Sequence, residues 1–141
     1  MRTAAGAMTA IAVLAGSLSL ITATPAAAAA YCSSSGYTAS GEPMERCTRL
    51  DNGTLYHTKR FKADGSTAAI TTYSKTAGST VTVSLGYTGV NGTQYGSSMS
   101  ISTGETKLKS FHMGYGHYEC TSSVGLMKWG STVYETPSAH C

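Results

Sequence analysis

Residues 79–102 constrain the fold of this chain more than any other stretch, because two runs of alternating side chains flank an Asn-Gly pair. A two-residue period of apolar and polar side chains is typical of a β-strand with one buried face. The stretch therefore predicts a β-hairpin with one apolar face, which needs a second layer of structure to be stable. The positions on that face are Val81, Val83, Leu85 and Tyr87 in the first run and Tyr95, Ser97, Met99 and Ile101 in the second.

The length of the hairpin loop decides which residues face each other. A two-residue turn would pair Val83 with Ser100 and place the two apolar rows on opposite faces. A three-residue loop, with Gly92 in the left-handed conformation, places both rows on one face. Because burial favours one shared apolar face, we predict the three-residue loop. The predicted register pairs Val81 with Ile101 and Val83 with Met99.

Turn signals recur about every ten residues along the rest of the chain, and no long helical period is present. This spacing predicts an all-β fold, a small antiparallel β-sandwich or barrel of seven or eight strands. The strand 54–62 has no consistently apolar face, so we expect it near the edge of a sheet. With two Phe and one Trp, the predicted core is modest and consists of Val81, Val83, Leu85, Met99, Ile101 and Trp129.

The first thirty residues predict a cleaved signal peptide rather than a part of the fold. Arg2 provides a positive start, residues 8–21 are apolar, and residues 26–30 offer small residues for cleavage. The apolar run is too short for a membrane anchor and no second run follows, so we expect residues 31–141 to form one secreted domain without a membrane span. After cleavage nine basic residues face seven acidic ones, which is too small an excess to favour nucleic acid as a partner.

Four cysteines, all within residues 31–141, predict two disulfides in an exported chain. Three pairings are available, and we favour Cys32–Cys47 with Cys120–Cys141 because these close the two shortest loops. Each bridge would hold one end of the domain and contribute about 2–4 kcal/mol. Zinc is the competing role for these thiols, but the sequence has no CxxC pair or Cys/His cluster, so we expect neither a metal nor a cofactor.

Residues 115–119 carry the side chains best suited to catalysis. On a continuous strand His117 and Glu119 would share a face with Tyr115, and a His–Glu pair can orient a proton transfer. The alternative, which we favour, is an exposed polar face beside Cys120. No Gly-x-Ser-x-Gly motif marks a nucleophilic serine. We therefore predict no catalytic residue, with a small hydrolase using His117 and Glu119 as an alternative.

Tyr56, Lys59 and Arg60 belong to a basic strand with interspersed aromatic residues. That mixture suits an acidic polymer or a phosphate backbone. Lysine on an edge strand also prevents sheets from aggregating edge to edge, and we favour that role for this strand.

Nine tyrosines stand in a background of Gly, Ser and Thr. Tyrosine offers a rigid ring and a hydroxyl group, which suit protein contacts and stacking on sugars. We expect Tyr87 and Tyr95 at the rim of the central hairpin, although the tyrosines of small secreted β-domains also commonly cover the core.

Together these features predict a secreted, non-catalytic protein-interaction module. Its partner would be another secreted or surface protein, and its role that of an adaptor in a larger secreted assembly or an inhibitor of an extracellular enzyme. Contact would be made by loops, by an exposed edge strand or by the Ser/Gly-rich segment that follows the signal peptide. The alternative is a cell-wall or polysaccharide-binding domain that uses its surface tyrosines. The candidate binding residues are Tyr56, Lys59, Arg60, Tyr87, Tyr95, Tyr115, His117 and Glu119.

Overall fold

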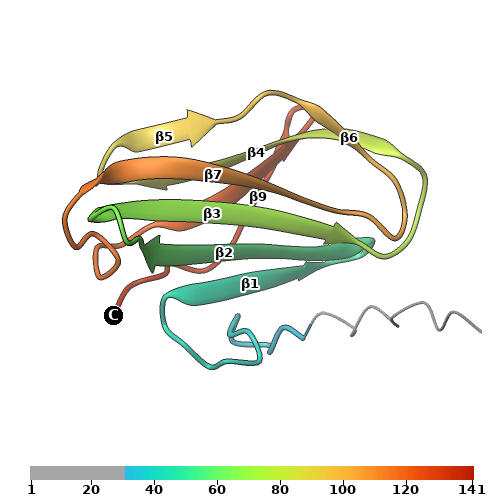
Figure 1. The fold of residues 1–141 in the computed structure, drawn as a ribbon. Coiled ribbons are helices and arrows are strands. Elements are labelled where there is room, and N and C mark those ends of the chain that lie inside the picture. Colours follow the sequence, from blue (N-terminus) through green and yellow to red (C-terminus); the bar gives the residue numbers. More distant parts are fainter. Residues whose placement is uncertain (1–30) are drawn as a thin grey trace, which may run out of the picture.

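The chain folds into two antiparallel β-sheets that lie face to face as a sandwich (Figure 1). The computed structural model describes residues 31–141, and the predicted signal peptide with its cleavage site lies outside them. The structure confirms the predicted all-β sandwich with two disulfides. Within residues 31–141, no helix has the length and apolarity needed to cross a membrane.

Each sheet combines a run of consecutive strands with strands from a later part of the chain. The first sheet has the order β1-β2-β3-β7, and the second has the order β5-β4-β8-β9 with β6 also paired to β4. The strands of the first sheet are β1 (Glu45–Leu50), β2 (Gly53–Phe61), β3 (Ser66–Lys75) and β7 (Thr106–Tyr115). Those of the second are β4 (Val81–Gly89), β5 (Gly92–Tyr95), β6 (Met99–Ile101), β8 (Val124–Trp129) and β9 (Thr132–Glu135).

The hairpin of residues 79–102 has the predicted register at the end away from its turn. β4 and β6 pair Val81 with Ile101 and Val83 with Met99. Val83 and Ile101 are buried at 1% and 0% exposure, so the apolar rows do share one face. Burial of that face is therefore sufficient to explain the register.

The turn of this hairpin differs from the prediction. Gly89 pairs with Gly92, which makes the connection one residue shorter than the predicted loop, although Gly92 keeps the predicted left-handed conformation with φ of 74°. Tyr95 pairs with Gly86, one residue out of register with the pairs of β6. Tyr95 consequently faces outward instead of joining the apolar face. The shift divides the predicted second strand into β5 and β6, and residues 31–141 contain nine strands.

Two clusters of buried side chains fill the space between the sheets. Of the predicted core residues, Val83, Leu85 and Ile101 are buried, and Val81 and Met99 lie half-buried against them. The larger cluster consists of Leu55, Tyr73, Val83, Leu85, Ile101 and Met127. The smaller one consists of Ala69, Tyr87, Phe111 and Met113.

The prediction that Trp129 belongs to the core is wrong. Its side chain is 48% exposed, because Trp129 is the last residue of β8 and pairs with Thr132 beside the β8–β9 turn. It lies on the same side of the strand as Met127, but at the opening of a pocket rather than between the sheets.

Strand 54–62, predicted near an edge, lies next to the edge strand β1 but is not itself an edge strand. β2 pairs with β1 on one side and with β3 on the other. Its inward row, Leu55, His57 and Lys59, is buried at 0%, 0% and 3% exposure. The polar side chains of His57 and Lys59 are thus part of the interior, where hydrogen bonds across the sandwich satisfy their polar atoms.

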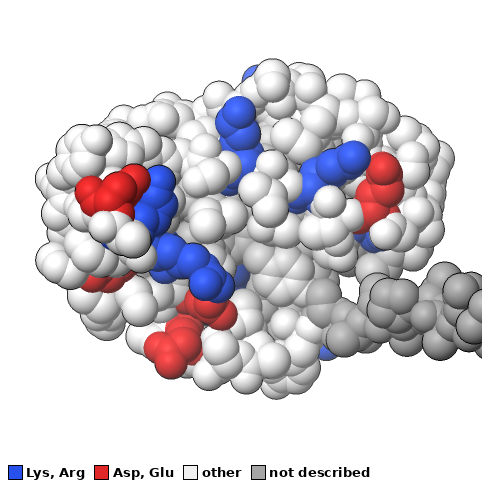
Figure 2. Space-filling view, viewed as in Figure 1, with Lys and Arg blue, Asp and Glu red and all other residues white. Residues whose placement is uncertain are grey.

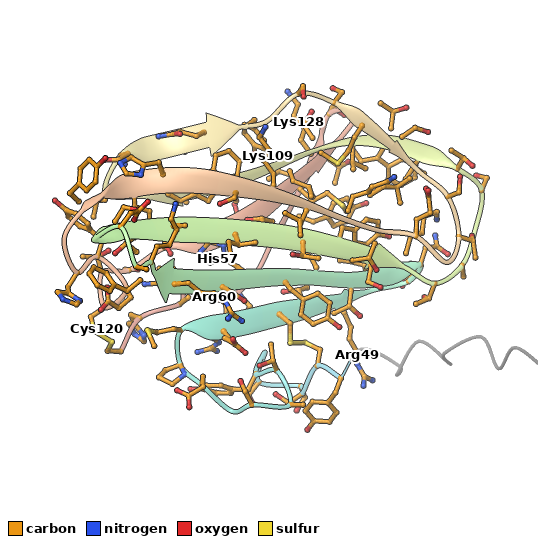
Figure 3. The ribbon with its side chains drawn as sticks, in the orientation of Figure 1. Arg49, His57, Arg60, Lys109, Cys120 and Lys128 are labelled. Carbon is orange, nitrogen blue, oxygen red and sulfur yellow. A yellow bond between two sulfur atoms is a disulfide. The ribbon has the colours of Figure 1, made fainter. Side chains whose placement is uncertain are left out.

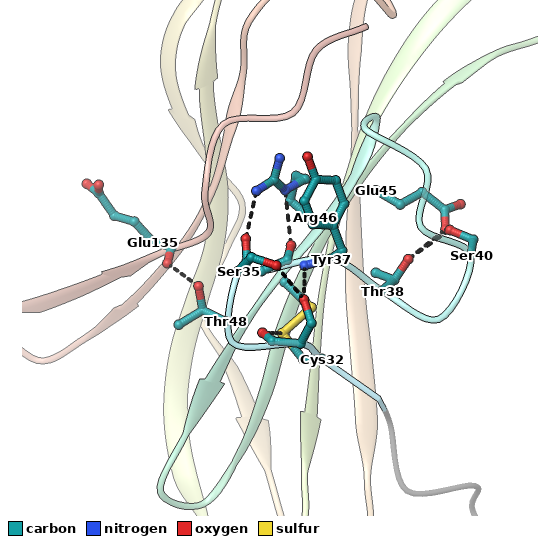
Figure 4. Close-up of a disulfide and its surroundings, with 12 residues drawn as sticks. Cys32, Ser35, Tyr37, Thr38, Ser40, Glu45, Arg46, Thr48 and Glu135 are labelled. Carbon is teal, nitrogen blue, oxygen red and sulfur yellow. Dashed lines mark hydrogen bonds between the residues drawn. A yellow bond between two sulfur atoms is a disulfide. The ribbon is translucent and has the colours of Figure 1, made fainter.

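The disulfides join Cys32 to Cys47 and Cys120 to Cys141, as predicted. Two disulfides indicate an oxidising environment. The first bridge holds the N-terminal segment against β1 (Figure 4). Arg46 strengthens this attachment, since its guanidinium donates to the carbonyls of Gly36 (3.0 Å) and Ser35 (2.9 Å). The Ser/Gly-rich segment is therefore fixed to its own domain and is not an extended arm.

Arg46→Lys is expected to lower the free energy of unfolding by about 1–2 kcal/mol, because a lysine cannot donate to both carbonyls with a planar fork. Urea unfolding of the oxidised protein measures the change. Arg60→Lys is the matched control, since Arg60 is exposed and its contact with Glu45 is 3.5 Å long. Equal stability of the Arg46→Lys variant and the original protein would contradict the assigned role.

Candidate functional site

A cavity of about 230 Å³ opens at the end of the sandwich that holds the β1–β2 turn. We call it the sandwich-end pocket. Figure 3 labels Arg49 at this end of the molecule and Cys120 at the other. Both sheets contribute to its lining, with Leu50, Tyr73 and Lys75 from the first and Val83, Met127, Trp129 and Tyr134 from the second.

The local sequence explains why this end stays open and well defined. Gly53 begins β2, and a Cβ atom there would lie 2.8 Å from a ring carbon of Tyr73 and 2.3 Å from the carbonyl oxygen of Ser74. Only glycine therefore lets Tyr73 occupy its place in the pocket wall. The carbonyl of Asn52 accepts hydrogen bonds from the amides of Thr76 (2.9 Å) and Ala77 (3.3 Å). These bonds fasten the β1–β2 turn to the turn after β3.

The pocket has an apolar floor and an aromatic rim. Val83, Met127 and Tyr73 are 1%, 3% and 4% exposed, whereas Trp129 is 48% exposed. The pKa of Tyr73 is raised, first by burial and then by the nearby Tyr134. An apolar group could thus be enclosed below while it contacts the indole above.

The charged side chains that line the pocket lie at different depths. Lys75 is 2% exposed and donates a hydrogen bond to the carbonyl of Ala77. Arg49 and Asp51 also contribute to the lining but are exposed to solvent. Among residues 31–141, neither Lys75 nor Arg49 lies within 4 Å of a carboxylate.

A second polar arrangement, His57 with Ser123 and Thr71, lies deep between the sheets. Thr71 donates to the carbonyl of Gly86 (2.7 Å), so its oxygen accepts from Nδ1 of His57 at 3.2 Å. The hydroxyl of Ser123 then donates to Nε2 at 2.8 Å. A neutral His57 is fully hydrogen-bonded by this arrangement. Nothing in the sequence pattern had indicated it, because the serine and threonine come from different strands and loops.

This buried Ser–His pair is structural rather than catalytic. Ser123 and His57 are 2% and 0% exposed, so no substrate can reach them. Burial lowers the pKa of His57 to about 4, and the charge of Lys59 acts in the same direction. The orienting partner is the hydroxyl of Thr71, whereas a nucleophilic serine needs an accessible position and a base whose cation is stabilised.

His117 and Glu119 do approach each other, but at the opposite end of the sandwich. Nδ1 of His117 lies 2.7 Å from a carboxylate oxygen of Glu119, and this contact is the main cause of the lowered pKa of Glu119. The imidazole stacks on Phe61 with ring centres 4.0 Å apart. Tyr115 does not join them, because it packs edge-on against His112. The strand ends at Tyr115, and positive φ angles at the flanking glycines turn the chain away.

The predicted basic surface on β2 is not one surface. Lys59 faces inward and donates to the carbonyls of Thr121 and Ala139. Burial lowers its pKa to about 8, while Glu119 opposes that shift. Tyr56 and Arg60 face the other way, along a shallow groove on the first sheet. Figure 2 shows that Lys and Arg on this face are interspersed with acidic residues and form no single basic patch.

The candidate tyrosines do not form one surface either. Tyr87, predicted at the rim, is 0% exposed and packs against Phe111 with ring centres 5.1 Å apart. Tyr95 is 39% exposed on β5 and covers Gly86, and Tyr115 is 75% exposed at the end of β7. Two tyrosines that sequence analysis had not singled out, Tyr73 and Tyr134, both line the sandwich-end pocket.

Comparison with known proteins gave no relative: no family model, curated protein or solved structure matches this chain. Within residues 31–141, no group of three or more His, Cys, Asp or Glu side chains is close enough to hold a metal ion.

Proposed function

We propose that this protein is a secreted, non-catalytic binding protein that captures another extracellular protein at the sandwich-end pocket. An apolar side chain of the partner enters the pocket, and the rim around Trp129 contacts the surface next to it. Adaptor proteins and enzyme inhibitors both use such a contact, in which one anchor residue fills a preformed hole.

One observation carries this proposal. The sandwich-end pocket has a floor of the buried apolar side chains Val83 and Met127, and its opening is bordered by Trp129, which is 48% exposed. A pocket of about 230 Å³ is smaller than the ~300–1,000 Å³ typical of sites for drug-sized ligands. Its size therefore fits a single side chain better than a whole cofactor. The β1–β2 turn and the turn after β3, which are hydrogen-bonded to each other, fix one side of the pocket and lower the entropic cost of binding.

A saccharide is the second candidate ligand. Trp129 offers an exposed ring beside the side chains of Asp51 and Asn52, which can hydrogen-bond sugar hydroxyls. This version places the sugar at the pocket and not on the scattered surface tyrosines.

Trp129→Ala is expected to reduce recovery of the partner at least about tenfold, because an aromatic anchor at a pocket rim commonly contributes more than 1.4 kcal/mol. The tagged protein is incubated with culture supernatant from its source organism, and co-purifying proteins are compared between variants. Tyr115→Ala is the matched control, since Tyr115 is an exposed aromatic residue at the far end of the sandwich. A specific partner that Trp129→Ala still recovers fully would contradict the proposed site. Absence of any specific partner, with Trp129-dependent binding to a glycan array, would establish the saccharide candidate instead.

A further inference from the structure

The sandwich-end pocket contains a buried positive charge that its own domain leaves without an anion. Lys75 is 2% exposed, and the hydrogen bond that its ammonium makes goes to the carbonyl of Ala77. Two of its three N–H donors are left over. Among the described residues 31–141, no carboxylate lies within 4 Å of it. An ammonium in such surroundings gains strongly from an anion that enters the pocket.

The rim charges do not reverse this preference. Asp51 is the acidic member of the lining, and it is exposed to solvent together with Arg49 two residues before it. Water screens both of these charges, and their signs oppose each other. The potential inside the pocket therefore follows the sign of Lys75.

The remaining lining requires an apolar group beside the anion. Val83 and Met127 form the floor, and Tyr73 forms one wall. A phosphate or sulfate ion would lose its hydration against these side chains without compensating contacts. A carboxylate joined to a carbon that also bears an apolar side chain satisfies both parts of the pocket.

The position of the pocket favours the end of a chain as the source of that group. The opening lies at the end of the sandwich and is framed by the β1–β2 turn, which is hydrogen-bonded through Asn52 to the turn at Thr76 and Ala77. A group that enters between this pair of turns and Trp129 comes end-on. The C-terminal residue of a polypeptide can do so and carries its carboxylate next to its side chain.

We infer that the sandwich-end pocket recognises the C-terminal residue of its protein partner, with an apolar side chain against the floor and the terminal carboxylate at Lys75. This inference rests on the proposed function and specifies which part of the partner enters the pocket. Lys75 is the residue that distinguishes a chain end from an internal apolar side chain.

The test uses the fluorescence of Trp129, the only tryptophan in the chain. The probes are acetylated Gly-Ser peptides ending in phenylalanine, either with a free carboxylate or as the C-terminal amide, together with free N-acetyl-phenylalanine. We expect the acid peptide to bind at least tenfold more tightly than the amide. Lys75→Met is expected to abolish this ratio, whereas Lys62→Met, at the far end of the sandwich beside Asp64, leaves it unchanged.

Each outcome decides between the two proposals. Equal affinity of the acid and the amide overturns the role of the carboxylate but leaves the side-chain pocket intact. Free N-acetyl-phenylalanine that binds as tightly as the peptide overturns the chain end as the source. If no probe binds but recovery of a partner from the supernatant still depends on Trp129, this inference alone is overturned. If no probe binds and no partner is recovered through Trp129, the proposed function is overturned as well. The ratio of acid to amide affinity in the unaltered protein tests the role of the carboxylate even when Lys75→Met does not fold.

Discussion

Gly125→Ala is expected to lower the free energy of unfolding by about 3 kcal/mol. A Cβ atom at this position would lie 2.5 Å from Cβ of His57 and 2.9 Å from its Cγ. His57 cannot move aside, because its ring is held between Thr71 and Ser123 by hydrogen bonds of 3.2 and 2.8 Å. The methyl group must therefore push β8 away from β2 or break these bonds. Urea unfolding of the oxidised protein measures the loss.

Gly96→Ala is the control for this experiment. A Cβ atom on Gly96 would also lie too close to a neighbour, at 2.9 Å, but the neighbour is the flexible side chain of Lys109. Lys109 can adopt another rotamer at little cost, so we expect a change below about 1 kcal/mol. Similar losses for the two variants would show that crowding against the buried histidine is not the cause.

Acidification from pH 6.5 to pH 4 is expected to remove about 3 kcal/mol of stability through His57 alone. Burial lowers the pKa of His57 from 6.5 to about 4 in the folded protein. Between these values the unfolded chain binds the extra proton and the folded protein does not, so stability rises with pH across this window and falls on acidification. The physical cause is specific, since Nε2 accepts the hydroxyl hydrogen of Ser123 and must give up that bond when it is protonated.

His57→Gln isolates this contribution. Glutamine does not titrate and retains a polar group near Ser123, so its unfolding free energy should stay nearly constant between pH 6.5 and pH 4.5. Glu105 and Glu119, whose pKa values are lowered in the fold from the ordinary 4.5, affect both proteins alike and lose most of their contribution below pH 4.5. Parallel pH profiles for the variant and the original protein would contradict the assignment to His57.

The buried cations show how a small domain with few large apolar residues holds its loops. Arg46, Lys59 and Lys75 are 8%, 3% and 2% exposed, and each donates to backbone carbonyls of a loop or terminus. Arg46 fixes the N-terminal segment, and Lys59 fixes the C-terminal tail near the Cys120–Cys141 bridge. Charge-assisted hydrogen bonds to carbonyls here supplement the disulfides. The cation of the pocket belongs to the same group but faces a cavity.

Local rules determined much of this molecule from sequence alone. Alternation in residues 79–102 and frequent turns were enough for the all-β sandwich and for the pairing of Val83 with Met99, because the two-residue period of a strand admits one register that buries both apolar rows. The shortest closures were enough for both disulfides. These features depend on neighbours in the sequence or on a single hairpin.

The tertiary structure alone decided where the polar and aromatic side chains of the other strands lie. His57 and Lys59 have the sequence pattern of an edge strand, yet they are buried because their partners, Ser123, Thr121 and Ala139, are more than sixty residues away. The sandwich-end pocket likewise joins the β1–β2 turn to the β8–β9 hairpin, and Trp129 becomes its rim rather than part of the core. A hydrogen bond or a cavity between two sheets depends on which strands face each other, and periodicity along one strand carries no information about that.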